Sequence, residues 1–324
     1  MLIDDGEMYN LMERLFPICR SITGNGVRET LKIINDLIPL DIHEVPSGTK
    51  VFDWEIPDEW NIKDAYVKDE NGKRVIDFHN SNLHVVGYSI PYEGKLNLNE
   101  LSGHLYTLPD QPDLIPYVTS YYKRDWGFCL AHKDFLNLKD NLYDVKIDST
   151  LKPGSLSYGE LIIPGESDEE ILISTYICHP SMANNELSGP VVATFLAREL
   201  LNRKLRYTYR FVFVPETIGS IAYLSKNLDH MKKKVVAGYV ITCVGDPGNF
   251  SYLSTKEENT LTDRVTLHVL KNCDEKYIIF NFLERGSDER QYNSPGIDLP
   301  VGSLMRTIYR SYPEYHTSDD NLNF

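Results

Sequence analysis

The feature that most constrains this chain is the segment 171–200, ILISTYICHPSMANNELSGPVVATFLAREL. Residues 171–177 are apolar or β-branched, which is typical of a strand that is covered on both faces. A polar turn containing His179 follows, and Ser188 then opens a helix as its N-cap, with a proline in the first turn. Apolar residues recur at helical spacing up to residue 200. The segment therefore predicts a buried strand, a polar turn and a helix.

The same alternation continues through the second half of the chain. Strands are predicted at 156–163, 170–177, 206–214 and 235–243, and helices at 187–203 and 221–233. Strands that alternate with helices are typical of an α/β fold with a doubly wound, mostly parallel sheet. The first 54 residues read as helical over 5–38 and as extended over 41–52, and we expect them to join this fold.

The region between residues 55 and 150 has a different pattern. Its strand-like pieces are short and are separated by turn signals; they lie at 65–67, 75–78, 83–89, 104–107 and 127–132. We therefore predict a small all-β domain at 55–150, inserted into an α/β domain formed by 1–54 and 151–324. The insert is rich in aromatic residues, which either wall a substrate cleft or form the core of the small domain: Tyr117, Tyr121, Tyr122, Trp126 and Phe128.

Composition excludes several classes of function. The net charge of −14 argues against binding to nucleic acid, because phosphate groups need a basic surface. The acidic N-terminus has no signal-peptide pattern, and no apolar run reaches the ~20 residues that span a bilayer. The five cysteines are scattered without a Cys-x-x-Cys pair, so no disulfide framework is indicated. We expect a cytoplasmic protein without a membrane partner, and no feature points to a particular oligomeric state.

Polar residues follow several of the predicted strands. His179 and Asn185 follow one strand, Glu216 and Asp246 follow the next two, and His316 lies near the end of the chain. Because the carboxyl ends of parallel strands meet at one edge of a sheet, we expect these side chains to converge. Two histidines with nearby acidic groups suit Zn²⁺, and a glutamate beside such a metal can take a proton from bound water. This is the chemistry of metal-assisted hydrolysis.

Each of these residues also has a purely structural interpretation. His179 can hydrogen-bond a turn, His316 can face solvent, and Glu216 and Asp246 can favour a helix N-terminus or a loop. Only their joint placement favours the hydrolase. A cysteine or serine hydrolase is disfavoured because there is no Gly-x-Ser-x-Gly elbow and because adjacent strand residues, such as Cys178 and its histidine neighbour, point to opposite faces.

Several blocks of sequence resemble a known family. They are LFPICRSITGNG at 15–26, HPSMAN at 179–184, SG at 188–189, GSDERQY at 286–292, SPGI at 294–297 and YHTS at 315–318. With these blocks the chain resembles the co-catalytic zinc aminopeptidases, the exopeptidase superfamily that uses two metals. It is more closely similar to the bacterial aminopeptidase-like proteins associated with polysaccharide biosynthesis. The resemblance implies an aminopeptidase-type α/β core with an inserted β domain.

The resemblance also implies roles for individual residues. His179 matches the first metal-binding histidine, His316 the last, and Glu216 the general base. Asp246 is the nearest candidate for the aspartate after the third core strand, and Asp288 matches a motif that orients the site. The complete predicted site comprises the catalytic Glu216, the metal ligands His179, Asn185, Asp246 and His316, and the substrate-binding or orienting residues Glu186, Asp288 and Tyr315.

Three departures from the family pattern matter. Asn185 stands where the family has a bridging carboxylate, and Thr217 stands where a dinuclear enzyme has a second acid beside Glu216. A neutral amide oxygen is a weaker zinc ligand than a carboxylate, so we expect one zinc ion rather than two. The chain also stops at Phe324 without a helix after the histidine loop, so we expect it to be truncated.

Two hypotheses for function follow. The first is a metal-dependent hydrolase of amide or peptide bonds, acting on a peptide or an amide-bearing small molecule. If it is an exopeptidase, the free amino terminus of the substrate needs an acidic partner; the candidates are Glu186, Asp246, Glu314, Asp319 and Asp320. The second, which Asn185 and Thr217 favour, is a degenerate non-peptidase member. It binds a sugar, an amino sugar or a peptide, or it assists a protein of polysaccharide biosynthesis.

Overall fold

The computed structural model describes residues 5–273 and 276–323, so the first four residues and Phe324 lie outside the described residues. An eight-stranded sheet forms the body. Its strands, in spatial order, are β1 (Asp41–Pro46), β10 (Ser155–Ile163), β12 (Thr208–Val214), β11 (Glu170–Tyr176), β13 (Val235–Ile241), β16 (Val301–Met305), β14 (Phe250–Leu253) and β15 (Tyr277–Phe280). The four neighbours from β12 to β16 run parallel. The predicted α/β fold with a mostly parallel sheet is confirmed.

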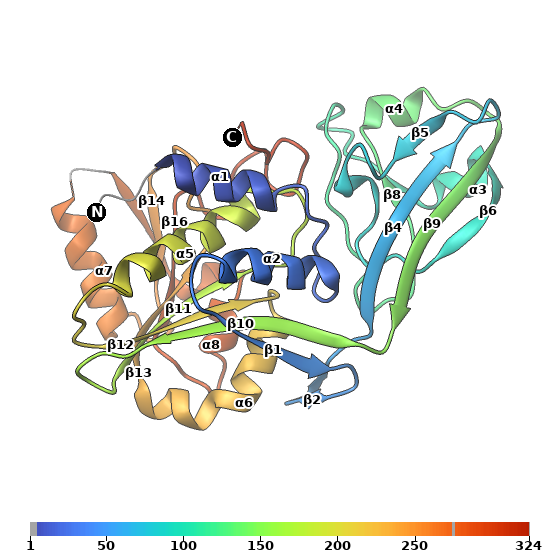
Figure 1. Cartoon of the computed structure of the whole chain (residues 1–324). Helices are drawn as coiled ribbons and strands as arrows, with labels where there is room; N and C mark the ends of the chain where they lie inside the picture. Colours follow the sequence, from blue (N-terminus) through green and yellow to red (C-terminus); the bar gives the residue numbers. More distant parts are fainter. Residues whose placement is uncertain (1–4, 274–275, 324) are drawn as a thin grey trace.

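Helices cover both faces of this sheet (Figure 1). On one face, α2 (Asn25–Asn35) and α5 (Ser188–Leu200) pack their apolar residues against β10, β11 and β12. On the other face, α6 (Ile218–Lys234) packs against the same strands. Helix α1 (Asp5–Leu15) lies on α5. The remaining helices of the body are α7 (Leu261–Asn272), the short α8 (Glu289–Tyr292) and the 3₁₀ turn η3 (Phe282–Glu284).

A separate four-stranded antiparallel sheet lies beside the body, in the order β5 (Arg74–Asp77), β4 (Glu59–Lys68), β9 (Leu142–Lys152) and β6 (Tyr92–Asn97). The long strands β4 and β9 connect it to the body (Figure 1). We call this part the insert. It also contains β7 (Leu105–Tyr106), β8 (Phe128–Cys129), the turn η1 (Asn82–His84) and two five-residue helices, α3 (Leu98–Ser102) and α4 (His132–Leu136). The insert is built mainly of β-strands, with two short helices among them.

The predicted domain boundaries stay a prediction. The short hairpin of β2 (Lys50–Val51) and β3 (Trp54–Glu55) crosses the first boundary, and β9 crosses the second. Two strands of the insert, β6 and β9, were not predicted, and residues 83–89 form no strand. In β9 apolar and polar residues alternate from Tyr143 to Asp148, so a period-2 signal was present in the sequence, and it ends at the polar run 148–150.

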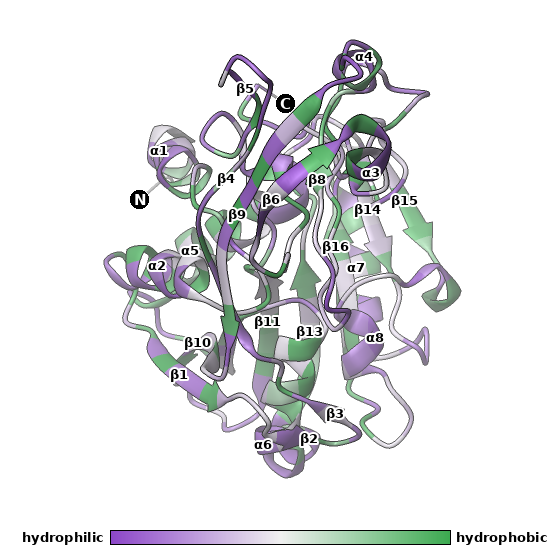
Figure 2. Ribbon diagram, turned by 90° about the vertical axis from the view of Figure 1, so that its right-hand side faces the viewer, coloured by the Kyte–Doolittle hydropathy of each residue, from purple (hydrophilic) through white to green (hydrophobic). Residues whose placement is uncertain are grey.

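The apolar core follows from the sequence pattern. In Figure 2 the central strands β11 and β13 are mostly hydrophobic, as expected for strands covered on both faces. The insert has its own core, in which Trp126 and Phe128 are buried. In the part of the chain that the structure describes, no helix has both the length and the apolar character needed to cross a membrane.

The start of the helix after β11 differs from the prediction. A π-helical turn, η2 (Ala183–Leu187), precedes α5, and Ser188 is the first residue of α5 rather than its cap. The Ser188 hydroxyl instead donates to the Asn184 carbonyl oxygen at 2.5 Å. The free backbone N–H groups of the turn are held by Asp320, whose carboxylate accepts from Asn184 N at 2.6 Å and from Asn185 N at 2.9 Å. A distant residue therefore caps this helix, which no local pattern indicates.

Candidate functional site

The loops at the carboxyl ends of the parallel strands do converge, together with the loop after β16. The rings of His179 and His316 lie 5.4 Å apart between centroids. The Nε2 atom of His179 lies 3.8 Å from a carboxylate oxygen of Glu216. His179 is 4% exposed, whereas the Glu216 side chain is 25% exposed and can be reached from solvent. Three of the predicted site residues are thus brought together.

His179 is fixed by a buried carboxylate and a buried arginine. Its Nδ1 atom lies 2.8 Å from Glu186 Oε2, and Arg20 Nε lies 3.6 Å from the other oxygen of Glu186. Arg20 also donates to the His179 carbonyl oxygen at 2.9 Å. Burial lowers the pKa of His179, but its contacts with Cys178 and Glu186 outweigh burial and raise that pKa well above the usual value. Arg20 was not predicted as a site residue; its only signal in the sequence was its place in the block 15–26, which resembles the family.

Glu216 is held by a loop from the far side of the site. Ser287 Oγ donates to Glu216 Oε1 at 2.6 Å. Thr217 has a φ of +64°, which is unusual for a β-branched residue, and its N–H donates to Asp288 at 2.7 Å. The Ser220 hydroxyl donates to the same Asp288 oxygen at 2.9 Å. Asp288 is fully buried, so it fixes the loop that carries Glu216 rather than contacting a substrate.

His316 lies within a cluster of aromatic rings. Tyr315 stacks on it, with ring centroids 3.9 Å apart, and Tyr117 from the insert meets it edge-on at 5.1 Å. Tyr117 also lies 5.2 Å from the ring of His179. Burial lowers the pKa of His316 to about 3, so its ring is neutral at neutral pH. Its Nε2 atom is buried without a hydrogen-bond partner.

Asn185 is buried beside the end of β13. Its amide nitrogen donates to the Tyr176 hydroxyl at 3.0 Å and lies 3.7 Å from the thiol of Cys243. Its amide oxygen is buried and has no partner. Burial raises the pKa of Cys243 to about 11, so the group next to Asn185 is a neutral thiol. Cys243 was not predicted as a site residue because the sequence pointed to Asp246 as the acid after this strand.

Asp246 is engaged elsewhere. Its carboxylate accepts hydrogen bonds from Thr307 Oγ1 at 2.6 Å, Gly248 N at 2.7 Å and Thr307 N at 3.0 Å. The Asn184 amide donates to it at 3.1 Å. The structure therefore joins Asp246 to the loop after β16 and not to the two histidines. A metal-binding role for Asp246 stays a prediction, and this geometry does not favour it.

The argument from strand alternation does not apply to Cys178, because β11 ends at Tyr176. Cys178 Sγ lies 3.6 Å from His179 Nδ1. The thiol is nevertheless unsuited as a nucleophile. It accepts the N–H of Glu216 at 3.2 Å, and burial raises its pKa to about 11.

Four of the five aromatic residues named in the insert divide between the two predicted roles, whereas Tyr122 is exposed. Trp126 and Phe128 belong to the core of the insert. Tyr117 and Tyr121 instead face the site, and their hydroxyls are 3.0 Å apart. The segment that carries them is paired to the histidine loop, because Tyr117 N donates to the His316 carbonyl oxygen at 2.9 Å. The insert thus supplies one wall of the site.

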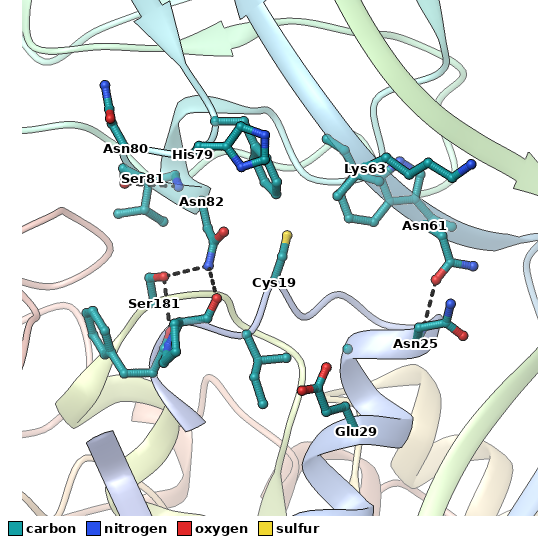
Figure 3. A pocket seen from close by; sticks show the side chains of 18 of the residues that line it. Cys19, Asn25, Glu29, Asn61, Lys63, His79, Asn80, Ser81, Asn82 and Ser181 are labelled. Carbon is teal, nitrogen blue, oxygen red and sulfur yellow. Dashed lines mark hydrogen bonds between the residues drawn. The ribbon is translucent and has the colours of Figure 1, made fainter. Parts of the chain in front are cut away.

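A cleft of about 790 Å³ is lined by residues of the insert and of the body (Figure 3). Ser181 and Ser318, each two residues beyond a site histidine, lie at its edge. Asn82 spans it by donating to Ser181 Oγ and to the Pro17 carbonyl oxygen, both at 2.9 Å, and the Cys19 side chain projects toward its centre. The residues that line this cleft do not include His179, Glu216 or His316.

Two buried atoms of the site have the chemistry of zinc ligands. His316 Nε2 and Asn185 Oδ1 are buried, lack partners, and are atoms that bind metals. In the described residues, one group of three possible ligands lies within 4.8 Å, namely Cys178, His179 and Glu186, but Glu186 already contacts Arg20 and His179. A metal on His179 would have to displace its proton, which makes binding depend on pH. Two ions would need a bridging carboxylate, and Asn185 does not provide one.

Comparison with known proteins places the chain in a family. Residues 9–324 match the family described as "Domain of unknown function (DUF4910)". A curated protein from Clostridium acetobutylicum, named "Putative polysaccharide biosynthesis protein with aminopeptidase-like domain", is 56% identical over 317 residues, which cover 98% of this chain and 73% of that protein. The chain belongs to the DUF4910 family. The predicted relationship to aminopeptidase-like proteins associated with polysaccharide biosynthesis is confirmed.

Solved structures agree with this assignment. A crystal structure described as a "putative peptidase" from Clostridium acetobutylicum superimposes with a TM-score of 0.97 at 55% identity, covering 98% of this chain and 75% of that one. A zinc aminopeptidase from Bacillus subtilis gives a TM-score of 0.67 at 12% identity, covering 98% and 89% of the two chains. At that identity the second likeness shows the fold alone, which is that of the zinc aminopeptidases.

Proposed function

We propose that this protein is a peptidase-like hydrolase of amide bonds. The observation that carries the proposal is the meeting of two histidines and a glutamate at the carboxyl ends of the central strands, where His179 Nε2 lies 3.8 Å from Glu216. The aminopeptidase-like domain in the name of the curated relative and the aminopeptidase fold support the same class of reaction. The substrate is accordingly a peptide or another amide-bearing small molecule.

His179 and His316 would hold one zinc ion, with the amide oxygen of Asn185 as a weaker third ligand. When bound, zinc would supply a Lewis acid and lower the pKa of water. The set has no carboxylate, so its zinc affinity is expected to be lower than that of a site with an acidic ligand.

The chain's own residues define the rest of the mechanism. Glu216 takes a proton from the attacking water and passes it to the leaving nitrogen, and its partly exposed carboxylate suits this task. Ser287 fixes one oxygen of Glu216, which leaves the other oxygen turned toward His179. The hydroxyls of Tyr117 and Tyr121 line the wall from which the insert faces the reacting amide.

Replacement of the general base tests this proposal. We expect Glu216→Gln to lower kcat for amide hydrolysis by roughly 10²–10⁴-fold, because the amide cannot accept a proton, while the fold is kept. Glu257→Gln, at an exposed glutamate with no described role in the site, is the matched control and should leave kcat unchanged. Equal activity of the Glu216 variant and the wild type would contradict the proposal.

The second candidate is a binding protein without hydrolytic activity. The specific observation that favours it is Asn185, a neutral residue whose oxygen lies buried without a partner where the family pattern has a carboxylate. Elemental analysis of protein supplied with zinc separates the two. About one zinc per chain supports the hydrolase, whereas no zinc supports the binding protein.

A further inference from the structure

An exopeptidase that removes amino-terminal residues must bind the charged amino group of its substrate, and a carboxylate is the usual partner of a buried ammonium group. Five acidic residues of the site loops are candidates for that partner: Glu186, Asp246, Glu314, Asp319 and Asp320. The contacts of each carboxylate decide whether it can bind the ammonium group of a substrate.

Glu186 is already committed to internal partners. It is 1% exposed and lies between the imidazole of His179 at 2.8 Å and the guanidinium of Arg20 at 3.6 Å. If it turned toward a ligand, the buried charge of Arg20 would lose its carboxylate partner and keep only its hydrogen bonds to uncharged oxygen atoms. Removing one partner of a buried ion pair is strongly destabilising, because the other charge is left buried without compensation.

Asp246 and Asp320 are committed in the same way. Asp246 is 5% exposed and accepts four hydrogen bonds, two of them from Thr307. Asp320 is fully buried and its two oxygens accept the backbone N–H groups of Asn184 and Asn185. Moving Asp320 would also uncap the helical turn that presents Asn185. Neither carboxylate is available to a substrate.

The remaining two acids are not built into the site. Asp319 is exposed, and Glu314 is half-buried in the same loop. Neither carboxylate has a hydrogen bond or an ion pair in the described residues that would hold it toward the histidines. Apart from Glu216, which the proposed reaction uses as its base, the described side chains around the two histidines are uncharged: Tyr117, Tyr121, Tyr315, Asn185 and the Cys243 thiol.

We infer that the substrate has no ammonium group beside the scissile bond, and that the site takes amides with a neutral acyl half, such as N-acylated compounds. This inference rests on the proposed hydrolase function and narrows its substrate class. In the reaction, water adds across the amide, the carbonyl carbon gains the oxygen, the C–N bond breaks, and the nitrogen takes the proton that Glu216 carries. The products are a carboxylic acid and an amine.

Two p-nitroanilides that differ only in the amino group test the inference. They are leucine p-nitroanilide and 4-methylpentanoyl p-nitroanilide, which is the same molecule without the ammonium. With zinc-loaded wild-type protein, we expect kcat/KM to be at least tenfold higher for the compound without the amino group. A higher value for leucine p-nitroanilide overturns the inference while the hydrolase proposal stands, and cleavage of neither contradicts the hydrolase proposal.

A binding measurement decides the substrate class even without turnover. Calorimetric or NMR titration of Glu216→Gln with leucinamide and with 4-methylpentanamide should give at least tenfold tighter binding of the second. Equal binding, tighter binding of leucinamide, or no binding of either overturns the inference. Glu314→Gln is the matched variant, and it should leave the affinity for leucinamide unchanged. A loss of that affinity would identify Glu314 as the partner of the ammonium group and would contradict the inference.

Discussion

The two ends of the central sheet differ in whether their buried polar groups have hydrogen-bond partners. At the end away from the site, Arg210 of β12 donates to Glu170 at 2.6 and 2.9 Å, to Glu160 at 2.5 Å and to the Tyr223 hydroxyl at 2.8 Å. His230 of α6 completes the group, with its Nε2 atom 2.7 Å from Glu170. Arg210 is 3% exposed, yet every side of its guanidinium has a partner.

At the end that carries the site, several buried polar atoms lack a hydrogen-bond partner. The described residues contain five buried side-chain polar atoms without a hydrogen-bond partner, and all five belong to residues of the site: Arg20 Nη2, Asn185 Oδ1, Glu186 Oε1, Asp288 Oδ2 and His316 Nε2. Unpaired buried groups cost free energy, and native proteins keep few of them. The comparison teaches that buried polar groups are paired at one end of the sheet and are left partly unpaired at the other, where His316 Nε2 and Asn185 Oδ1 are the two neutral acceptor atoms among them.

The largest expected effect on the free energy of unfolding comes from breaking the hydrogen-bonded network around Arg210. Arg210→Ala leaves Glu170 buried without its main partner, so we expect a loss of about 3–5 kcal/mol in the free energy of unfolding. Chemical denaturation followed by circular dichroism measures this loss. Zinc binding per folded chain should stay unchanged, because the network lies at the far end of the sheet. A loss below 1 kcal/mol would contradict the comparison.

Substitution of one histidine at each end of the sheet, His316 and His230, tests the same comparison through zinc affinity. His316→Ala should lower zinc affinity by at least tenfold, or about 1.4 kcal/mol, because it removes a neutral, unpartnered ring nitrogen. His230→Ala, at the satisfied end, should leave zinc affinity unchanged. Competition with a fluorescent chelator measures both. Equal zinc affinities for the two variants would show that His316 is not a ligand.

The smallest effect on stability is expected from a substitution at Glu59, where the insert joins the body. Glu59 of β4 accepts hydrogen bonds from Arg28 of α2, which hold its pKa at about 2, below its usual 4.5, although burial opposes the shift. A lowered acid pKa adds stability that is present above pH 4.5 and is lost as the pH falls toward 2.

Glu59→Gln should therefore lower the free energy of unfolding by about 1 kcal/mol at pH 7, a modest value because the side chains of Glu59 and Arg28 are both partly exposed. Near pH 2 the variant and the wild type should have nearly equal stability. Acid titration of thermal stability in both proteins measures the difference. An unchanged gap between the two proteins at pH 7 and pH 2 would contradict this account.

Sequence patterns predicted what depends on local chemistry. The strand 170–177 and the helix after it follow from apolar periodicity, and the convergence of His179, Glu216 and His316 follows from the general rule for parallel sheets. Partners that come from distant segments were not predictable. Asp320 caps η2, Arg20 supports Glu186, and Tyr117 reaches the histidines from the insert, and each contact depends on packing rather than on a neighbouring residue.

The pairing between the insert and the histidine loop has a consequence for how the protein folds. Ile115 and Ser318, which share a hydrogen bond of 3.1 Å, are 203 positions apart in the chain, and Gln111 reaches the Pro313 carbonyl oxygen across 202 positions. Contacts of such long sequence separation form late, because the loop between them must first be closed. The insert can complete its own sheet early in synthesis, but its tyrosine wall has no counterpart until residue 316 has been made. The site is thus among the last parts of the molecule to be assembled.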